Sequence, residues 1–285
     1  MAAKIGNAEV EGAVIGSSSL TFKPGKVTPG DYAFAVGTAG SATLVLQTIL
    51  PPLLIASGPS TLKLEGGTHN PFAPPFDFLA KAFLPIINRM GPRVTATLVR
   101  PGFYPAGGGE FHVSIQPVDR LLPLNLVERG AIKTKRAVAR VAALQKNIAE
   151  REIDVIAEKL TWDRKDLRVE VVSHSRGPGN IVVIEIECEH VTEVFTGFGE
   201  RGVQAEAVAN QAIDATREYI ASEAAVGSYL ADQLLIPLAI SGSGSFTTLP
   251  LSRHSTTNID VIRRFLSLEI TTEQVICDQW KISVG

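Results

Sequence analysis

Charged residues are distributed unevenly along this 285-residue chain, and that distribution limits what the chain can fold into. Residues 126–222 carry 30 Asp, Glu, Lys and Arg side chains, whereas residues 1–125 carry 16 and residues 223–285 carry 10. The flanks are rich instead in Gly, Pro, Ser and Thr. Because a chain of this length can build one large core or two domains, we expect a discontinuous domain over 1–125 and 223–285. The ordinarily charged region 126–222 is then an inserted domain.

Periodicity inside the insert predicts two helices packed on one sheet. Apolar residues in one helical stripe predict a helix over 147–162, and a second helix is expected over 204–222. Ile184, Ile186 and Cys188 alternate with glutamates, which is typical of a half-buried strand. Further strands are expected over 132–144 and 167–173.

The flanks repeat a related pattern of two helices with about four strands. Helices are expected over 42–50 and 76–90, and Pro51-Pro52 is expected to end the first of them. Strands are expected over 19–24, 32–36, 61–64, 94–99 and 110–117. The predicted fold class is therefore α+β, with repeated units of two helices and a four-stranded sheet, interrupted by a smaller α+β domain.

Composition excludes several classes of protein. The net charge of −2 gives no global attraction for polyanions, so a nucleic-acid surface would have to be a local patch. Cys188 and Cys277 form no disulfide framework, which favours a reduced, cytoplasmic setting. Residues 1–6 lack a signal-peptide pattern, and the apolar run 42–56 is too short and too interrupted to span a membrane. No P-loop motif and no zinc-type Cys or His spacing is present.

Three glycine-rich segments allow a functional or a structural interpretation. Residues 197–202 match G-x-G-x-x-G, but the next segment, 226–240, has a helical pattern where a dinucleotide fold needs a second parallel strand, so we interpret the motif as a tight turn. The segment 65–75, with its paired glycines and prolines, is as compatible with a ligand-binding loop as with a plain turn. Residues 104–109 are typical of a hairpin or a bulge.

His254 is the strongest candidate for chemistry among the five histidines. It is expected in a short loop of small polar residues just before a helix pattern that begins near Ile259. A histidine placed in this way can be a nucleophile, a base or a ligand. His112 and His190 lie in strand patterns, His174 borders a turn, and His69 lies within the glycine-rich segment 65–75.

Several segments together resemble the RNA 3'-terminal phosphate cyclase family. They occur in order along nearly the whole chain: DYAFAVGTAGS at 31–41, TLVLQT at 43–48, the turn 66–75, GFYPAGGG at 102–109, AVGSYLADQ at 225–233 and LSRHSTTN at 251–258. The resemblance implies repeated two-helix, four-stranded units interrupted by a smaller α+β domain. That agrees with the division suggested by charge density.

The resemblance also implies roles for individual residues. His254 matches the histidine that becomes adenylylated, and Gln47 matches a glutamine that contacts ATP. The adenosine-binding segment corresponds to Tyr229, Leu230, Ala231, Asp232 and Gln233. In that setting Tyr229 can stack on adenine, and Asp232 or Gln233 can hydrogen-bond its edge. The Pro74-Pro75 turn would form the opposite wall, and Arg253 could hold phosphate oxygens or a structural carboxylate.

The implied activity is the ATP-dependent conversion of an RNA 3'-terminal phosphate to a 2',3'-cyclic phosphodiester. A histidine–AMP intermediate and a divalent cation, Mg²⁺ or Mn²⁺, belong to that chemistry. The sequence indicates neither the natural RNA nor the oligomeric state.

The chain also departs from the family pattern. The family has a further segment before the position of Ala2, with a strand, a glycine-rich turn and a helix, so we expect the first repeat to be incomplete here. A mis-assigned start, a truncation and a decayed gene would each explain it, and intact downstream motifs favour the first. Alternative functions are a non-catalytic cyclase-like protein that binds RNA in ribosome assembly, and an inactive truncated cyclase. An enolpyruvyl transferase would need converging Lys and Arg residues that the weakly charged flanks do not supply.

Overall fold

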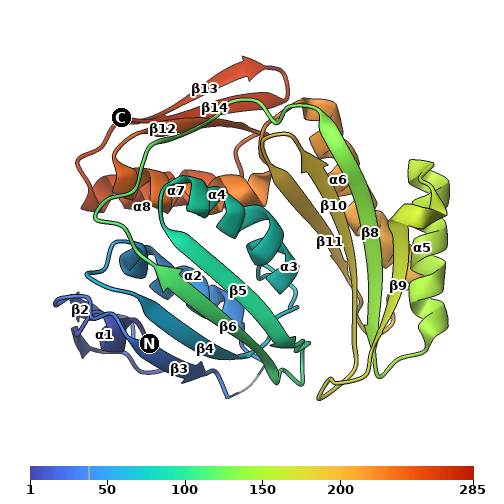
Figure 1. Cartoon of the computed structure of the whole chain (residues 1–285), viewed down its shortest axis with the longest axis horizontal. Coiled ribbons are helices and arrows are strands. Elements are labelled where there is room, and N and C mark those ends of the chain that lie inside the picture. Colours follow the sequence, from blue (N-terminus) through green and yellow to red (C-terminus); the bar gives the residue numbers. More distant parts are fainter. Residues whose placement is uncertain (38) are drawn as a thin grey trace.

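The chain folds into a mixed α and β structure in which strands form three four-stranded sheets and one short ribbon (Figure 1). The computed structural model describes residues 1–37 and 39–285. The helix α1 (Ala2–Ile5) and the ribbon of β1 (Glu9–Glu11) and β2 (Thr21–Lys23) come first in the chain. The predicted α+β class is therefore confirmed.

The first four-stranded sheet carries two helical segments from the same stretch of chain. Its strand order is β3-β4-β6-β5, with β3 and β4 parallel and the remaining neighbours antiparallel. In chain order the elements are β3 (Asp31–Ala35), α2 (Ala42–Leu54), β4 (Ser60–Gly66), the continuous helical run α3 (Phe76–Phe78), η1 (Leu79–Phe83) and α4 (Leu84–Arg89), then β5 (Arg93–Arg100) and β6 (Gly109–Gln116).

A second sheet repeats this arrangement with the same connectivity. Its strand order is β7-β12-β14-β13, again with the first pair parallel and the others antiparallel. The elements are β7 (Leu124–Leu126), α7 (Ser228–Ser241), β12 (Gly244–Thr248), α8 (Arg253–Phe265), β13 (Ile270–Ile276) and β14 (Gln279–Val284). These strands were not predicted from the sequence, because β7 and β12 are short and most of β13 is exposed rather than alternating.

The third sheet lies between β7 and α7 in the sequence. Its order is β11-β10-β8-β9, and it is built from β8 (Ile132–Ala142), α5 (Lys146–Leu160), η2 (Arg164–Asp166), β9 (Leu167–Val172), β10 (Gly179–Cys188), β11 (Thr192–Phe198) and α6 (Ala205–Ser222). Ile184, Ile186 and Cys188 are buried while the glutamates between them are half-buried, as the alternation predicted. The division at residues 126 and 222 into domains stays a prediction.

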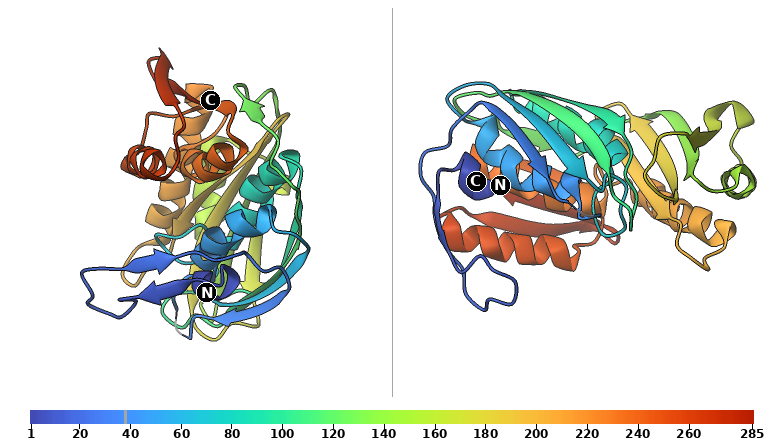
Figure 2. Two further views of the ribbon diagram at one scale, coloured as in Figure 1. Left: turned by 90° about the vertical axis from the view of Figure 1, so that its left-hand side faces the viewer. Right: turned by 90° about the horizontal axis from the view of Figure 1, so that it is seen from below.

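In Figure 1 the helices α7 and α8 lie between the strands β12–β14 above and β3–β6 below, and the first view of Figure 2 again shows the red helices beneath the red strands. Contacts between α7 and η1 join the two units directly, and η1 also contacts β11 of the third sheet. The element η1 is therefore the point at which all three parts of the molecule meet.

The prediction that Pro51-Pro52 ends the first flank helix is wrong. Helix α2 runs to Leu54 and contains both prolines. A proline inside a helix costs about 3 kcal/mol, but Leu53 and Leu54 are fully buried, and each such burial contributes about 1.5–3 kcal/mol. The backbone carbonyl of Leu54 accepts a hydrogen bond from the Val118 amide, so the end of the helix is satisfied.

The strand expected over 19–24 forms, but not in a four-stranded unit. It is β2, which pairs antiparallel with β1 in a separate ribbon. Among the residues described by the structure, no helix is long and apolar enough to cross a membrane.

Candidate active site

His254 lies in the first turn of α8, not in a loop that precedes the helix. The hydroxyl of Ser252 accepts a hydrogen bond from the Ser255 amide at 3.1 Å, and this N-cap starts the helix at Arg253. The expectation of a loop at this position is therefore wrong, because the cap lies two residues before the histidine.

The His254 side chain is exposed and free to react. Its imidazole makes no hydrogen bond or ion pair with any residue of 1–37 or 39–285. Phosphate oxygens bind favourably at the first turn of a helix, where backbone N–H groups and the helix dipole are oriented toward them. Arg253 is exposed beside the histidine and likewise has no carboxylate partner in the described part of the chain.

A side-chain contact ties the helix of His254 to the segment 229–233. Asn258, one turn after His254, donates from its amide nitrogen to the Asp232 carbonyl at 3.1 Å and to the Asp232 carboxylate at 3.0 Å. Residues four apart lie on one face of a helix. His254 therefore lies on the same face of α8 as Asn258, which contacts α7, and the structure brings the histidine motif close to the 229–233 segment.

The five residues of the 229–233 segment differ in what they can offer a ligand. Tyr229 is 74% exposed at the start of α7, and Asp232 and Gln233 are half-buried. Leu230 and Ala231 are buried in the core, so only their backbone atoms could face a ligand.

Unpartnered polar atoms lie at the same place. The side-chain oxygen of Gln233 is buried without a hydrogen bond, and so is the hydroxyl of Thr248 at the end of β12. Thr248 forms a parallel bridge with Val226, two residues before α7 begins. Buried oxygens without partners are costly, so both atoms are free to accept a hydrogen bond from a further donor.

Gln47 comes from the other unit. It is half-buried on α2, and its amide makes no hydrogen bond within the described ranges. No hydrogen bond or ion pair among those residues joins Gln47 to α7 or α8, so its grouping with His254 stays a prediction.

A buried charged cluster that the sequence analysis did not identify joins the first unit to the inserted sheet. His69 Nε2 lies 2.9 Å from Asp77 Oδ2, and Arg140 Nη1 lies 3.0 Å from the same oxygen. Burial alone would raise the pKa of Asp77, but the hydrogen bond from His69 and the charge of Arg140 hold it well below its ordinary value. Arg140 also binds Glu170 at 3.0 Å. The only signal in the sequence was the place of His69 within the glycine-rich segment 65–75.

The turn at 197–202 is structural, as expected. β11 is antiparallel to β10 and leads into α6, so no parallel βαβ unit surrounds the motif. A side chain at Gly197 would collide with the Val208 carbonyl at 2.0 Å, and one at Gly199 with Asn180 at 2.1 Å. Close packing therefore explains these two glycines without a ligand.

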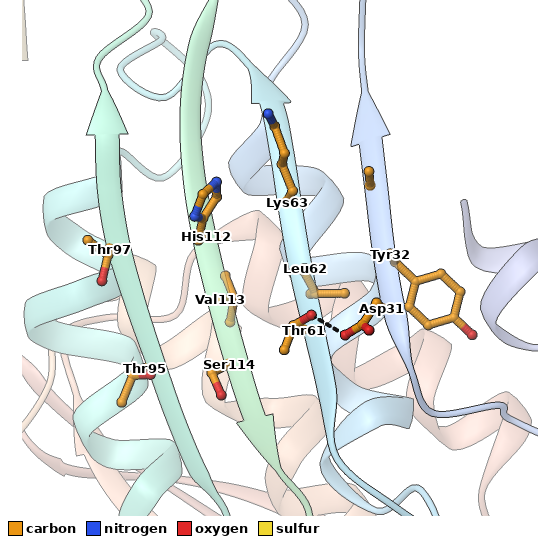
Figure 3. Close-up of a pocket in the computed structure, with 11 residues that line it drawn as sticks. Asp31, Tyr32, Thr61, Leu62, Lys63, Thr95, Thr97, His112, Val113 and Ser114 are labelled. Carbon is orange, nitrogen blue, oxygen red and sulfur yellow. Dashed lines mark hydrogen bonds between the residues drawn. The ribbon is translucent and has the colours of Figure 1, made fainter.

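A shallow hollow of about 550 Å³ lies on the outer face of the first sheet, away from these residues (Figure 3). Its lining includes Lys63 and His112, each held by Glu110 at 3.2 and 2.9 Å. None of the predicted site residues lines it. The described residues also contain no cluster of three or more His, Cys, Asp or Glu side chains arranged for a metal.

Two units with one strand order, interrupted by a third sheet, define an α+β protein built from repeats. The family model described as RNA 3'-terminal phosphate cyclase matches residues 1–272. Proteins named RNA 3'-terminal phosphate cyclase are similar to this chain. That of Koribacter versatilis (strain Ellin345) is 52% identical over 275 residues, which cover 96% of this chain and 78% of the relative. That of Ectopseudomonas mendocina (strain ymp) is 49% identical over 273 residues, which cover 96% of this chain and 80% of the relative.

The chain therefore belongs to the RNA 3'-terminal phosphate cyclase family, as its motifs predicted, and is an enzyme of that family.

Proposed function

We propose that the enzyme uses ATP to convert an RNA 3'-terminal phosphate into a 2',3'-cyclic phosphodiester, with His254 as the nucleophile that carries AMP. The observation that supports this most strongly is the exposed, unpartnered His254 on a helix tied by Asn258 to the segment 229–233. A reactive group and a base-binding segment are thereby joined by one side-chain contact.

The residues of that segment suit adenosine. The exposed ring of Tyr229 offers a stacking face, and base–aromatic stacking is worth about 1–3 kcal/mol. The unpartnered oxygen of Gln233 can accept a hydrogen bond from the adenine amino group, which would satisfy it. Gln47 is proposed as a further ATP contact on the strength of its match to the family motif.

The first step forms a bond between an imidazole nitrogen of His254 and the α-phosphorus of ATP. The bond from that phosphorus to the bridging oxygen breaks, and pyrophosphate leaves. In the second step an oxygen of the RNA 3'-phosphate attacks the same phosphorus, the phosphorus–nitrogen bond breaks, and the adenylyl group moves to the RNA.

In the third step the neighbouring 2'-hydroxyl attacks the activated 3'-phosphorus. The hydroxyl loses its proton, a cyclic phosphodiester closes, and AMP leaves. This step is intramolecular, so proximity supplies much of its rate. The need for a 2'-hydroxyl also restricts the final step to RNA.

A divalent cation, Mg²⁺ or Mn²⁺, would neutralise phosphate charge when bound with the nucleotide. Mg²⁺ is usually held by one or two carboxylates together with phosphates and waters. The described residues contain no group of three or more His, Cys, Asp or Glu side chains that could hold the cation, so no step is assigned to a cation bound by the protein.

Labelling with α-³²P-ATP tests the proposal. We expect the purified chain with Mg²⁺ or Mn²⁺ to acquire an acid-labile label, and we expect His254→Ala to abolish it. His174→Ala is the matched control, because His174 is also exposed and lies on the inserted region. Label that persists in His254→Ala would exclude this nucleophile. RNA binding without any label on the folded parent would favour a non-catalytic RNA-binding role.

A further inference from the structure

Two glutamate carboxyl groups are buried in the insert, and one of them contacts a residue outside the insert. Glu152 on α5 is fully buried, and within residues 1–37 and 39–285 its carboxyl group hydrogen-bonds only to Asn180, which also belongs to the insert. Glu193 on β11 is 1% exposed, and its carboxylate contacts Gly227, which belongs to the second unit. Burial raises the pKa of both groups to about 7. Burying a carboxyl group costs free energy unless the group has hydrogen-bond partners. The few contacts that such a group makes therefore matter for the stability of the buried arrangement.

The contact is short and lies at the start of α7. Glu193 Oε1 accepts a hydrogen bond from the Gly227 amide at 2.6 Å, and Gly227 is the N-cap residue of α7. A side chain at Gly227 would place its first carbon 3.3 Å from that oxygen, so glycine permits the close approach. Tyr229 follows two residues later, and the 229–233 segment begins there.

The same stretch of backbone is held from its other side by β12. The Ala225 amide donates to the Thr247 hydroxyl at 3.0 Å, and the Val226 amide donates to the Thr247 carbonyl at 3.0 Å. Three successive amides are therefore fixed, two by the second unit itself and the third by the insert. The Gly227 amide is the one closest to Tyr229 in the sequence. The hydrogen bond from Gly227 to Glu193 is therefore the last of these three contacts before the 229–233 segment.

We propose that Glu193 is a positioning residue through which the inserted sheet fixes the nucleotide-binding end of α7. The insert then contributes to ATP affinity without touching the nucleotide. This inference rests on the proposed function, since it assigns ATP to the 229–233 segment.

Glu193 would act on ATP affinity through the fraction of molecules in which the first turn of α7 is closed. Without an acceptor, the buried Gly227 amide is unsatisfied, and the first turn of α7 then gains by opening toward water. A ligand that needs the closed turn binds with an affinity reduced by the fraction of molecules in which the turn is closed. A turn closed about one tenth of the time raises the dissociation constant about tenfold.

The experiment compares paired substitutions in the full chain by equilibrium binding of ATP and by the rate of label incorporation at saturating ATP. We expect Glu193→Ala to raise the dissociation constant about tenfold, with little change in the saturated rate. Glu193→Gln keeps an oxygen that can accept from Gly227, and we expect it to stay within about threefold of the parent. Glu152→Ala is the matched control, because it removes a carboxyl of similar burial that has no contact outside the insert.

Equal losses in Glu193→Ala and Glu152→Ala would overturn the inference, because they would reflect general weakening of the insert. Unchanged ATP affinity in a folded Glu193→Ala would overturn it as well. Hydrogen–deuterium exchange of the 225–233 peptide gives a second readout that needs no ATP. We expect faster exchange there in Glu193→Ala than in Glu152→Ala. If the parent binds no ATP, the proposed function fails, while this exchange result still decides whether Glu193 holds the turn.

Discussion

At the scale of single residues, the buried carboxyl groups of this chain fall into two electrostatic situations. Asp77 is held by His69 and Arg140, and those partners keep the pKa of its carboxyl low in spite of burial. Glu152 has one amide partner and one oxygen with no partner, so burial dominates and raises its pKa to about 7. Only the first kind of carboxyl contributes stability by being ionised.

Glu152 therefore makes the stability of the fold depend on pH in a defined direction. In the folded state its pKa is about 7, against an ordinary value of 4.5. The folded state holds the proton more tightly, so the contribution of this group is complete below pH 4.5 and is lost as pH rises toward 7. Glu152→Gln removes that loss. We expect the variant to gain stability over the parent between pH 5 and pH 8, by at most about 3 kcal/mol.

Urea unfolding at the two pH values measures this difference. Glu158→Gln is the control, since Glu158 is exposed on the same helix. A variant-to-parent difference that does not change with pH would contradict the expectation.

The sequence allowed candidate site residues to be named where their chemistry is evident from their local setting. His254 in a run of small polar residues and the 229–233 segment could be named from motifs. Asn258 and Glu193 could not, because their roles depend on partners 26 and 34 residues away. Nothing in the local pattern of an asparagine or a buried glutamate indicates which backbone atom it will meet in the fold.

At the scale of elements, the side-chain amide of Asn258 joins α8 to α7 at Asp232. Asn258→Ala would leave the backbone carbonyl and one carboxylate oxygen of Asp232 without that donor. A lost hydrogen bond to a charged group costs about 1.5–3 kcal/mol. We expect label incorporation at saturating ATP to slow about tenfold or more, because the two helices lose their fixed spacing.

Thr257→Ala is the matched control for Asn258→Ala, since Thr257 is exposed on the adjacent position of α8. We expect its labelling rate to match that of the parent. Equal labelling rates in both variants would mean that the hydrogen bonds from Asn258 to Asp232 do not affect the first step.

Element boundaries were predictable where local chemistry decides them and not where tertiary burial does. The strands and helices of the insert follow their hydrophobic periods closely. Helix α2 passes two prolines because Leu53 and Leu54 are buried beyond them, and no local rule anticipates that. The second unit's sheet was missed because its parallel pair, β7 and β12, joins segments separated by the whole insert.

At the scale of the whole molecule, the insert is joined to the first unit through the buried ion pair of Asp77 and Arg140. Removing one partner of a buried pair leaves an uncompensated charge and costs about 3–5 kcal/mol. We expect Arg140→Leu to lower the free energy of unfolding by about 3 kcal/mol. Because the low pKa of Asp77 gives stability only where the group is ionised, the difference from the parent should shrink below pH 3.8.

Arg136→Leu on the same strand is the control for this substitution. Its side chain is 54% exposed and pairs with Glu185 at 3.6 Å. Exposed pairs contribute about 0–1 kcal/mol, so we expect a change no larger than that in chemical denaturation. Equal effects of the two substitutions would show that the buried pair does not join the parts.

The position of the insert has a consequence for the order in which the chain folds. β7 and β12 pair although they are far apart in the sequence. For example, Ser245 donates a hydrogen bond to Asn125, 120 residues earlier in the chain. Arg129 donates to the carbonyls of Tyr219 and Ile220 at 2.7 and 2.8 Å, which pins the two ends of the insert together. Once the insert has folded, the connection between β7 and β12 is shortened to the segment that carries α7, which saves roughly 1 kcal/mol of closure entropy. The insert is thus expected to be an early folding unit on which completion of the second sheet depends.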